Sequence, residues 1–141
     1  MVLKVELVSP ERIAYSGEAK MVIARTIEGD IAFLPGHVHF IGVLDTYPVR
    51  VLQEDDQAQV IAVHQGVVEV APDGEDTRVT ILSDVCELSD VIDVKRAERS
   101  REAAQHQLTS DPDDAEAQAA LARAEVRLAV AEGRPTDLRG S

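Results

Sequence analysis

The sequence is poor in the residues that mark several classes of protein. It contains one cysteine and no tryptophan, and aromatic residues make up only 3% of its 141 residues. The single cysteine, Cys86, can form neither an intramolecular disulfide nor a thiolate metal site, which fits a reducing compartment. With so few aromatic side chains the core must be aliphatic, and a ring-lined site for a carbohydrate or similar ligand is disfavoured.

Basic residues and long hydrophobic runs are also scarce. The sequence has 14 lysines and arginines against 26 acidic residues, for a net charge of −12. A phosphate-binding surface needs a basic field, so this balance argues against nucleic acid as a partner and against an anionic membrane surface. No apolar run approaches the roughly 20 residues that span a bilayer, so we expect no direct membrane insertion. Lys4 and Glu6 interrupt the first apolar residues, so we also expect no signal peptide.

Residues 1–88 carry the pattern of short β-strands. Their β-branched runs recur at roughly ten-residue intervals and are separated by turn signals, as in a β-sandwich or flattened barrel. No helical segment lies between them, which argues against a parallel α/β sheet. The predicted strands are residues 2–8, 19–25, 49–52, 60–63, 67–70 and 79–82.

From Ser89 onward the composition changes to strong helix formers, mainly Ala, Glu, Arg and Gln. We predict an antiparallel α-helical hairpin over residues 89–134, broken at 109–114, followed by a polar tail at 135–141. The candidate N-caps are Ser89 or Asp90 for the first helix and Asp113 or Asp114 for the second. The predicted contact stripes are mostly alanine, which buries little apolar area, so the hairpin should be only marginally docked. A permanent lid and a segment that changes partners both remain open.

The residues that carry catalytic chemistry form no set with suitable spacing. His37 and His39 would share one face of an extended segment, but no third metal ligand accompanies them. His64 ends an apolar strand and is interpreted as a surface or turn residue. Cys86 lies among acids that raise a thiol pKa, so it is interpreted as a packing residue. We therefore predict no catalytic residues, no metal site and no required cofactor.

Three arginines of the predicted hairpin are candidates for a polyphosphate site. Arg96 lies in the first turn of the first helix, and Arg123 and Arg127 lie four residues apart on the second. Folding the hairpin would bring their guanidinium groups together near a helix start. Mixtures of arginine and glutamate are also the ordinary surface of helices, and from the residues alone that interpretation is favoured.

Residues 28–39, with the sequence E-G-D-I-A-F-L-P-G-H-V-H, read as a hairpin with polar ends. Pro35 and Gly36 suit the two central positions of a type II turn, because proline fixes φ and glycine accepts a positive φ. The stretch resembles the G-x-I-x-x-L-P-G-H loop of bacterial-type ε subunits of F-type ATP synthases. In that resemblance the subunit-docking residues are Glu28, Gly29, Asp30, Ile31, Leu34, Pro35, Gly36 and His37.

Other motifs extend the resemblance along the chain in the family's order. They are L-K-V-E-L-V-S-P-E-R at 3–12, V-H-Q-G-V-V-E-V-A at 63–71, V-T-I-L at 79–82, I-D-V-K-R-A at 92–97 and A-A-L-A-R-A-E-V-R-L at 119–128. I-D-V-K-R-A is similar to the family's [I/L]-D-x-x-R-A motif. His39 stands where the family commonly has proline.

The resemblance implies a non-catalytic rotor subunit at the cytoplasmic face of the plasma membrane. Its sandwich would contact the γ subunit and the c-ring, and its hairpin would extend toward the α/β catalytic head to restrain ATP hydrolysis. It also implies regulatory ATP bound by Glu87, Asp93, Arg96, Arg123 and Arg127. Ala103 replaces an arginine of tight binders, so we expect weak binding. The alternative is a free-standing ATP-sensing module that closes its hairpin over nucleotide.

Overall fold

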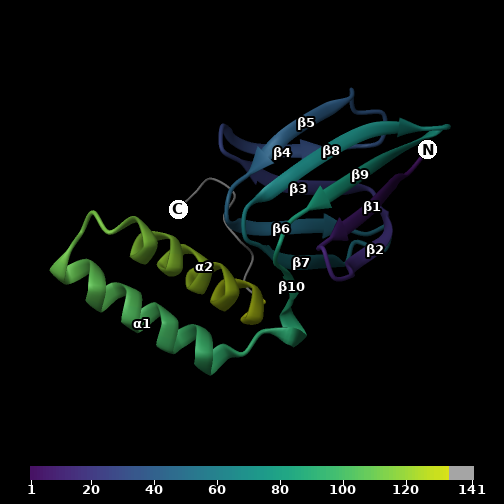
Figure 1. Ribbon diagram of the computed structural model, residues 1–141. Coiled ribbons are helices and arrows are strands. Elements are labelled where there is room, and N and C mark those ends of the chain that lie inside the picture. The colour runs from purple at the N-terminus through teal and green to yellow at the C-terminus, as the bar shows by residue number, and fades with distance from the viewer. Residues whose placement is uncertain (134–141) are drawn as a thin grey trace.

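The computed structural model, which describes residues 1–133, consists of a β-sandwich followed by a helical hairpin (Figure 1). The strands are β1 (Leu3–Val8), β2 (Ile13–Ala19), β3 (Met21–Thr26), β4 (Gly29–Phe33), β5 (Phe40–Leu44), β6 (Tyr47–Leu52), β7 (Ala58–Val63), β8 (Gly66–Asp73), β9 (Asp76–Leu82) and β10 (Cys86–Leu88). A short 3₁₀ turn, η1 (Ser89–Val91), leads into α1 (Val94–Ser110) and α2 (Ala115–Ala131). This confirms the predicted fold class.

The ten strands form one sheet that curls almost into a barrel. Their order is β10-β7-β6-β3-β5-β8-β9-β1-β2, and β4 pairs only with β3. β10, at one end of this path, lies near β2 at the other end. All strand pairs in the path are antiparallel except β1 with β9. The predicted strands do not include β2, β4, β5 or β10, because each is short or carries glycine and polar residues; β4 lies within the hairpin predicted at 28–39.

The sandwich core is aliphatic, as the shortage of aromatic residues requires. Alternate residues of each strand face inward, so that Leu3, Val5 and Leu7 of β1 are at most 1% exposed. Phe33, at the end of β4, is the largest of the fully buried side chains. Cys86 is also buried, at the start of β10, and burial raises the pKa of its thiol. The prediction that Cys86 is a packing residue is confirmed.

The turn at Pro35 and Gly36 has the predicted form. The amide of His37 donates to the carbonyl of Leu34 at 3.0 Å, which closes a four-residue turn. Gly36 has a φ of 86°, which fits the third position of a type II turn. Its own amide donates to Thr77 Oγ1 at 2.8 Å, so the turn is attached to β9.

The helices form an antiparallel hairpin in which α2 lies between α1 and the sandwich (Figure 1). Ala97 and Ala104 of α1 are buried, as the predicted stripe requires, and so are Ala124 and Leu128 of α2. A second face of α2 packs on the sandwich: Val126 and Val130 form a small cluster with Ala62 and Ile92. The sequence predicts only the alanine-rich stripe and not this face, although its two valines are spaced i, i+4.

The caps correct one prediction and confirm another. α1 is capped by Asp93, whose carboxylate accepts from the amide of Arg96, and not by Ser89 or Asp90. The two earlier residues form the 3₁₀ turn η1 instead. α2 is capped by Asp114, which was one of the two predicted candidates.

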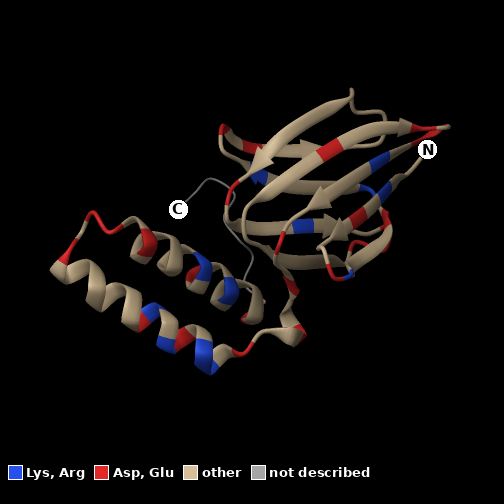
Figure 2. Cartoon of the chain, viewed as in Figure 1, with Lys and Arg blue, Asp and Glu red and all other residues tan. Residues whose placement is uncertain are grey.

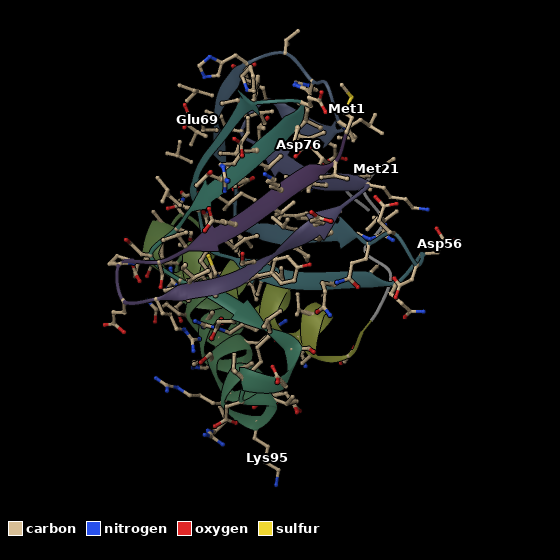
Figure 3. All side chains as sticks on the ribbon, turned by 90° about the vertical axis from the view of Figure 1, so that its right-hand side faces the viewer. Met1, Met21, Asp56, Glu69, Asp76 and Lys95 are labelled. Carbon is tan, nitrogen blue, oxygen red and sulfur yellow. The ribbon has the colours of Figure 1, made fainter. Side chains whose placement is uncertain are left out.

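The predicted end of the hairpin at 134 and the polar tail at 135–141 lie outside the described residues. Among residues 1–133, no helix is long and apolar enough to cross a membrane. In a side view, Asp76 lies toward one end of the molecule and Lys95, at the start of α1, at the other (Figure 3). The sandwich and the hairpin therefore present separate surfaces.

Candidate functional site

The start of α1, the end of α2 and strand β10 surround a small polar pocket. Its volume is about 240 Å³, and it is lined by Glu87, Val91, Asp93, Arg96, Ala97, Ser100 and Arg127. Figure 2 shows that the basic residues of both helices gather at this end of the hairpin. Four of the five predicted nucleotide-binding residues therefore line one pocket.

The fifth predicted residue lies apart from the others. Arg123 does not line the pocket, and its Nη2 lies 3.4 Å from Glu116 Oε1 on the same helix. Asp93 lines the pocket, but its Oδ1 already accepts from the amide of Arg96 at 3.0 Å. Ala103 is exposed on α1, and its methyl group cannot supply the positive charge that an arginine at this position would offer a phosphate.

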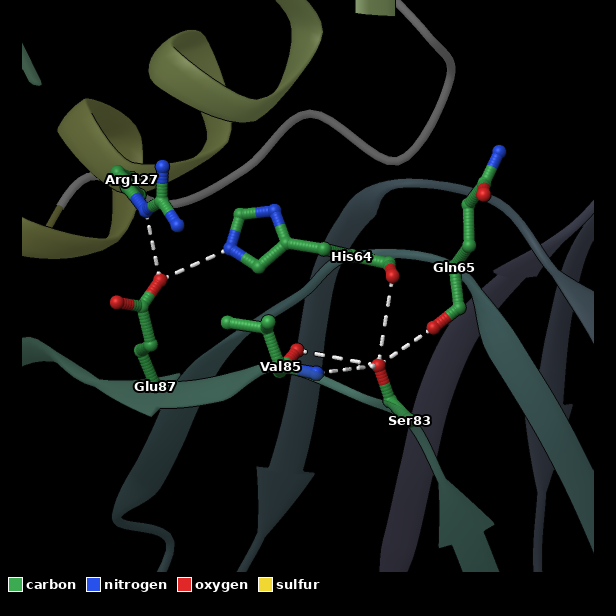
Figure 4. A network of polar contacts seen from close by, with 6 residues as sticks. All are labelled: His64, Gln65, Ser83, Val85, Glu87 and Arg127. Carbon is green, nitrogen blue, oxygen red and sulfur yellow. Dashed lines mark hydrogen bonds and ion pairs between the residues drawn. The ribbon is translucent and has the colours of Figure 1, made fainter. Parts of the chain in front are cut away.

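Glu87 is the centre of a polar network that joins the sandwich to α2 (Figure 4). Its Oε1 accepts from His64 Nε2 at 2.9 Å and from Arg127 Nε at 2.8 Å. The hydrogen bond from His64, followed by that from Arg127, lowers the pKa of Glu87 to about 2. Because the ionised carboxylate can only accept, Nε2 of His64 must carry a hydrogen.

His64 lies in the turn between β7 and β8, as one of the two predicted alternatives had it, but it is not on the surface. Its side chain is 4% exposed, and Nδ1 is buried without a hydrogen-bond partner in residues 1–133. The sequence places it at a strand end, where exposure is the usual outcome. It is buried instead because α2 docks across the same end of the sandwich.

Ser83 fixes the backbone around His64. Its Oγ donates to the carbonyl of Gln65 at 2.5 Å, which ties the β7–β8 corner to the β9–β10 corner, and it lies 3.1 Å from the carbonyl oxygen of Val85. Gln65 has a φ of 60°. A Cβ on Gly66 would lie 2.3 Å from the carbonyl oxygen of Leu82, so this close approach of two strands requires glycine.

The predicted docking loop is divided between core and surface. Phe33 is buried, and Ile31 is half-buried and packs against the core. Leu34 and Val38, on either side of the turn, are 49% and 74% exposed. Glu28, Gly29 and Asp30 are exposed at the start of β4, and Asp30 Oδ1 accepts from Arg25 Nε at 2.8 Å. His37 packs edge-on against Phe33 with ring centroids 5.2 Å apart.

An apolar strip on the outer face of the sheet was not found from the sequence. Val43 of β5 pairs with Val67 of β8, and Val67 pairs with Leu82 of β9. Ile41 lies two residues before Val43 on β5 and so on the same face. We call Ile41, Val43, Val67 and Leu82 the outer strip; they are 65%, 49%, 40% and 53% exposed. The signal was a two-residue alternation in Ile41 and Val43, which is hard to recognise in so short a strand.

The fold and the site define a two-part binding and regulatory protein. A β-sandwich presents an exposed apolar strip, and a helical hairpin is attached to the same sandwich through a small apolar cluster and an ion-pair network. Residues 2–89 match the family model of the ATP synthase delta/epsilon chain β-sandwich domain, and residues 90–132 match that of its long α-helix domain. The chain therefore belongs to the delta/epsilon chain family of ATP synthase, a family of non-catalytic subunits of the stalk.

Individual relatives agree with the family models. The chain is 44% identical to the ATP synthase epsilon chain of Streptomyces coelicolor over 132 residues, which cover 94% of this chain and 97% of that one. It is 41% identical to the epsilon chain of Bacillus subtilis over 112 residues, covering 79% and 81%. A chain in the structure of the Euglena gracilis mitochondrial ATP synthase shares the fold with a TM-score of 0.67, at 19% identity, over 93% of this chain and 78% of that chain.

Proposed function

We propose that this chain is the ε subunit of the central stalk, where it couples rotation of the c-ring to the γ shaft. Its sandwich contacts γ and the c-ring. Its hairpin restrains ATP hydrolysis when it extends toward the α/β catalytic head. In that position the subunit is peripheral to the membrane and is held there by its partners. The relatives named as epsilon chains support this function across both parts of the chain.

The outer strip is the observation that carries the docking half of the proposal. Four large apolar side chains lie together on one sheet face, although the aliphatic core of the sandwich is complete without them. A contiguous apolar patch on a soluble surface marks a contact with a partner. Away from the strip the same face becomes charged, where Arg78 pairs with Glu6 and Asp73 at 2.8 and 2.9 Å. The alternative function, a free-standing ATP-sensing module, leaves this strip without a role.

Replacing one residue of the strip tests the docking proposal. Val67→Asp should abolish co-purification with γ, because the carboxylate would be buried in an apolar contact without a partner. Ala58→Asp, at an exposed position near the start of β7, is the matched control and should co-purify as the parent does. Both variants should retain the circular dichroism of the parent. Normal co-purification of a folded Val67→Asp chain would remove the strip as the contact surface.

The loop over residues 28–39 supplies a second contact, with the c-ring. Its exposed apolar residues are Leu34 and Val38, so these two, rather than Ile31, should be replaced to test it. Leu34→Asp should weaken association with the c-ring while the isolated chain folds normally. Ile31→Asp should instead destabilise the sandwich, since Ile31 packs against the core.

The pocket between β10 and the hairpin is the proposed site for regulatory ATP. Glu87, Asp93, Arg96 and Arg127 line it, but its volume of about 240 Å³ is below the roughly 300–1,000 Å³ of ordinary ligand pockets. With Ala103 in place of an arginine, we expect a millimolar Kd, which corresponds to roughly −4 kcal/mol. At an ATP concentration equal to Kd, binding would stabilise the docked hairpin by RT ln 2, about 0.4 kcal/mol.

The distance between the hairpin and the sandwich, followed while ATP is titrated, tests this regulation. Closure at millimolar ATP in the parent and its loss in Arg96→Ala are the expected results. Arg99→Ala, on the same helix but outside the pocket lining, should close as the parent does. Identical titrations of Arg96→Ala and the parent would remove nucleotide sensing and leave a purely mechanical restraint.

A further inference from the structure

A single carboxylate oxygen receives hydrogen bonds from both parts of the molecule. His64, at the end of β7, and Arg127, on α2, both donate to Oε1 of Glu87. Glu87 itself belongs to β10, so two of the three residues are part of the sandwich (Figure 4). Whether Arg127 finds its acceptor therefore depends on where the sandwich holds the Glu87 side chain.

His64 is well placed to hold that side chain. Its imidazole is 4% exposed, and its backbone is fixed by the bonds that Ser83 makes across the two corners. Glu87 is 21% exposed and has rotatable bonds that would otherwise move its carboxylate. An acceptor that is already fixed costs less conformational entropy when a second donor binds. His64 therefore prepares Glu87 for Arg127.

The environment of the other ring nitrogen, Nδ1, also indicates that His64 is there for its hydrogen bond to Glu87. Nδ1 is buried and has no hydrogen-bond partner among residues 1–133, which is unfavourable for a polar atom. An apolar side chain of similar size would avoid that cost. Within residues 1–133 the imidazole is compensated at Nε2 alone, by its hydrogen bond to Glu87.

We propose that His64 is a positioning residue for the hairpin: it holds Glu87 in the orientation that accepts Arg127 and thereby raises the fraction of molecules with α2 docked. The physiological meaning of this role rests on the restraint of hydrolysis proposed above. Docking itself can be measured on the isolated full-length chain, so the two can fail separately.

Backbone hydrogen exchange of α2, compared with that of β8 and β9, measures docking without labels. His64→Leu removes the donor and keeps an apolar side chain, whereas His64→Gln places an amide near the position of Nε2. His64→Leu should speed α2 exchange about tenfold, the size expected for a hydrogen bond to a charged group. Exchange in β8 and β9 should not change, and His64→Gln should resemble the parent.

Repeating the comparison in Arg127→Met separates positioning from a merely structural role. There His64→Leu should give no further increase in α2 exchange. The same increase in both backgrounds, no increase in either, or equal behaviour of His64→Gln and His64→Leu would overturn the proposal. If His64→Leu does not fold, His64→Asn, whose amide cannot reach Glu87, takes its place with the same expected results. Normal restraint of hydrolysis in a complex whose α2 exchange has changed would contradict the proposed restraint but not the positioning role.

Discussion

The sandwich and the hairpin are built from the same aliphatic residue types but are stabilised very differently. The sandwich core joins side chains from β1 to β10 in one large cluster of fully buried leucine, valine, isoleucine and Phe33. The hairpin touches the sandwich through Val126 and Val130, which cluster with Ala62 of β7 and with Ile92 of the connection before α1, and through the Glu87 network. The comparison indicates that one part keeps its structure while the other can be released, since few contacts must break.

Truncating one buried side chain in each part should give the largest difference in the free energy of unfolding between the sandwich and the hairpin. Phe33→Ala, in the sandwich, should lower the free energy of unfolding by about 3–5 kcal/mol. Val126→Ala, at the hairpin contact, should lower it by only about 1 kcal/mol and should act mainly by releasing α2. Urea unfolding followed by circular dichroism, together with exchange of α2 amides, measures both. Equal losses in the two variants would mean that the hairpin belongs to one cooperative unit with the sandwich.

The Glu87 network should make hairpin docking depend on pH in the acid range. The pKa of Glu87 is lowered from 4.5 to about 2 in the folded chain, so its contribution is complete above pH 4.5 and is lost as the pH falls toward 2. At about 1.4 kcal/mol per pKa unit, reduced for partial exposure, the contribution is about 2 kcal/mol. Glu87→Gln should cost this amount at pH 7.

The pH dependence of unfolding free energy tests this value for the Glu87 carboxylate. The stability difference between Glu87→Gln and the parent should narrow from pH 5 to pH 3, because Glu87 takes up a proton in the unfolded parent, with a pKa near 4.5, while it is still ionised in the folded parent. Comparison of the two chains cancels the titration of the other acidic residues. A difference that stays constant over this range would show that packing, not charge, accounts for the effect.

The helix caps should have the smallest effect and should sharpen the contrast within the hairpin. The carboxylate of Asp114 accepts from the amide of Ala117, and this hydrogen bond lowers the pKa of Asp114. Asp114→Ala should therefore lower hairpin stability through the loss of this N-cap hydrogen bond. Asp113→Ala, at the neighbouring position that caps nothing, should be close to neutral. Exchange of the first α2 amides distinguishes them, and equal effects would contradict the assigned cap.

The division into sandwich and hairpin could be predicted from the sequence, because the change from a two-residue to a helical period at Ser89 is a local signal. The turn at Pro35 and Gly36 could be predicted for the same reason. The burial of His64 and the outer strip could not. Both depend on which distant segments meet, α2 on the end of the sandwich in one case and three paired strands in the other.

The candidate pocket, likewise, could be predicted from the sequence only in part. Glu87, Asp93, Arg96 and Arg127 were predicted through the family motif, and the hairpin brings them together. The pairing of Arg127 with Glu87 and His64, and the separation of Arg123 from the pocket, depend on helix rotation. A stripe that is mostly alanine does not specify that rotation closely, so only the packed structure could reveal it.

The most direct test of the division of labour is ATP hydrolysis by an assembled complex whose chain ends at Leu88. The sandwich is complete at that residue, so the shortened chain should assemble with γ and the c-ring as the full chain does. Hydrolysis by the complex should rise, because α1 and α2 are no longer there to restrain it. Failure of the shortened chain to assemble, or unchanged hydrolysis in a complex that does assemble, would contradict the account.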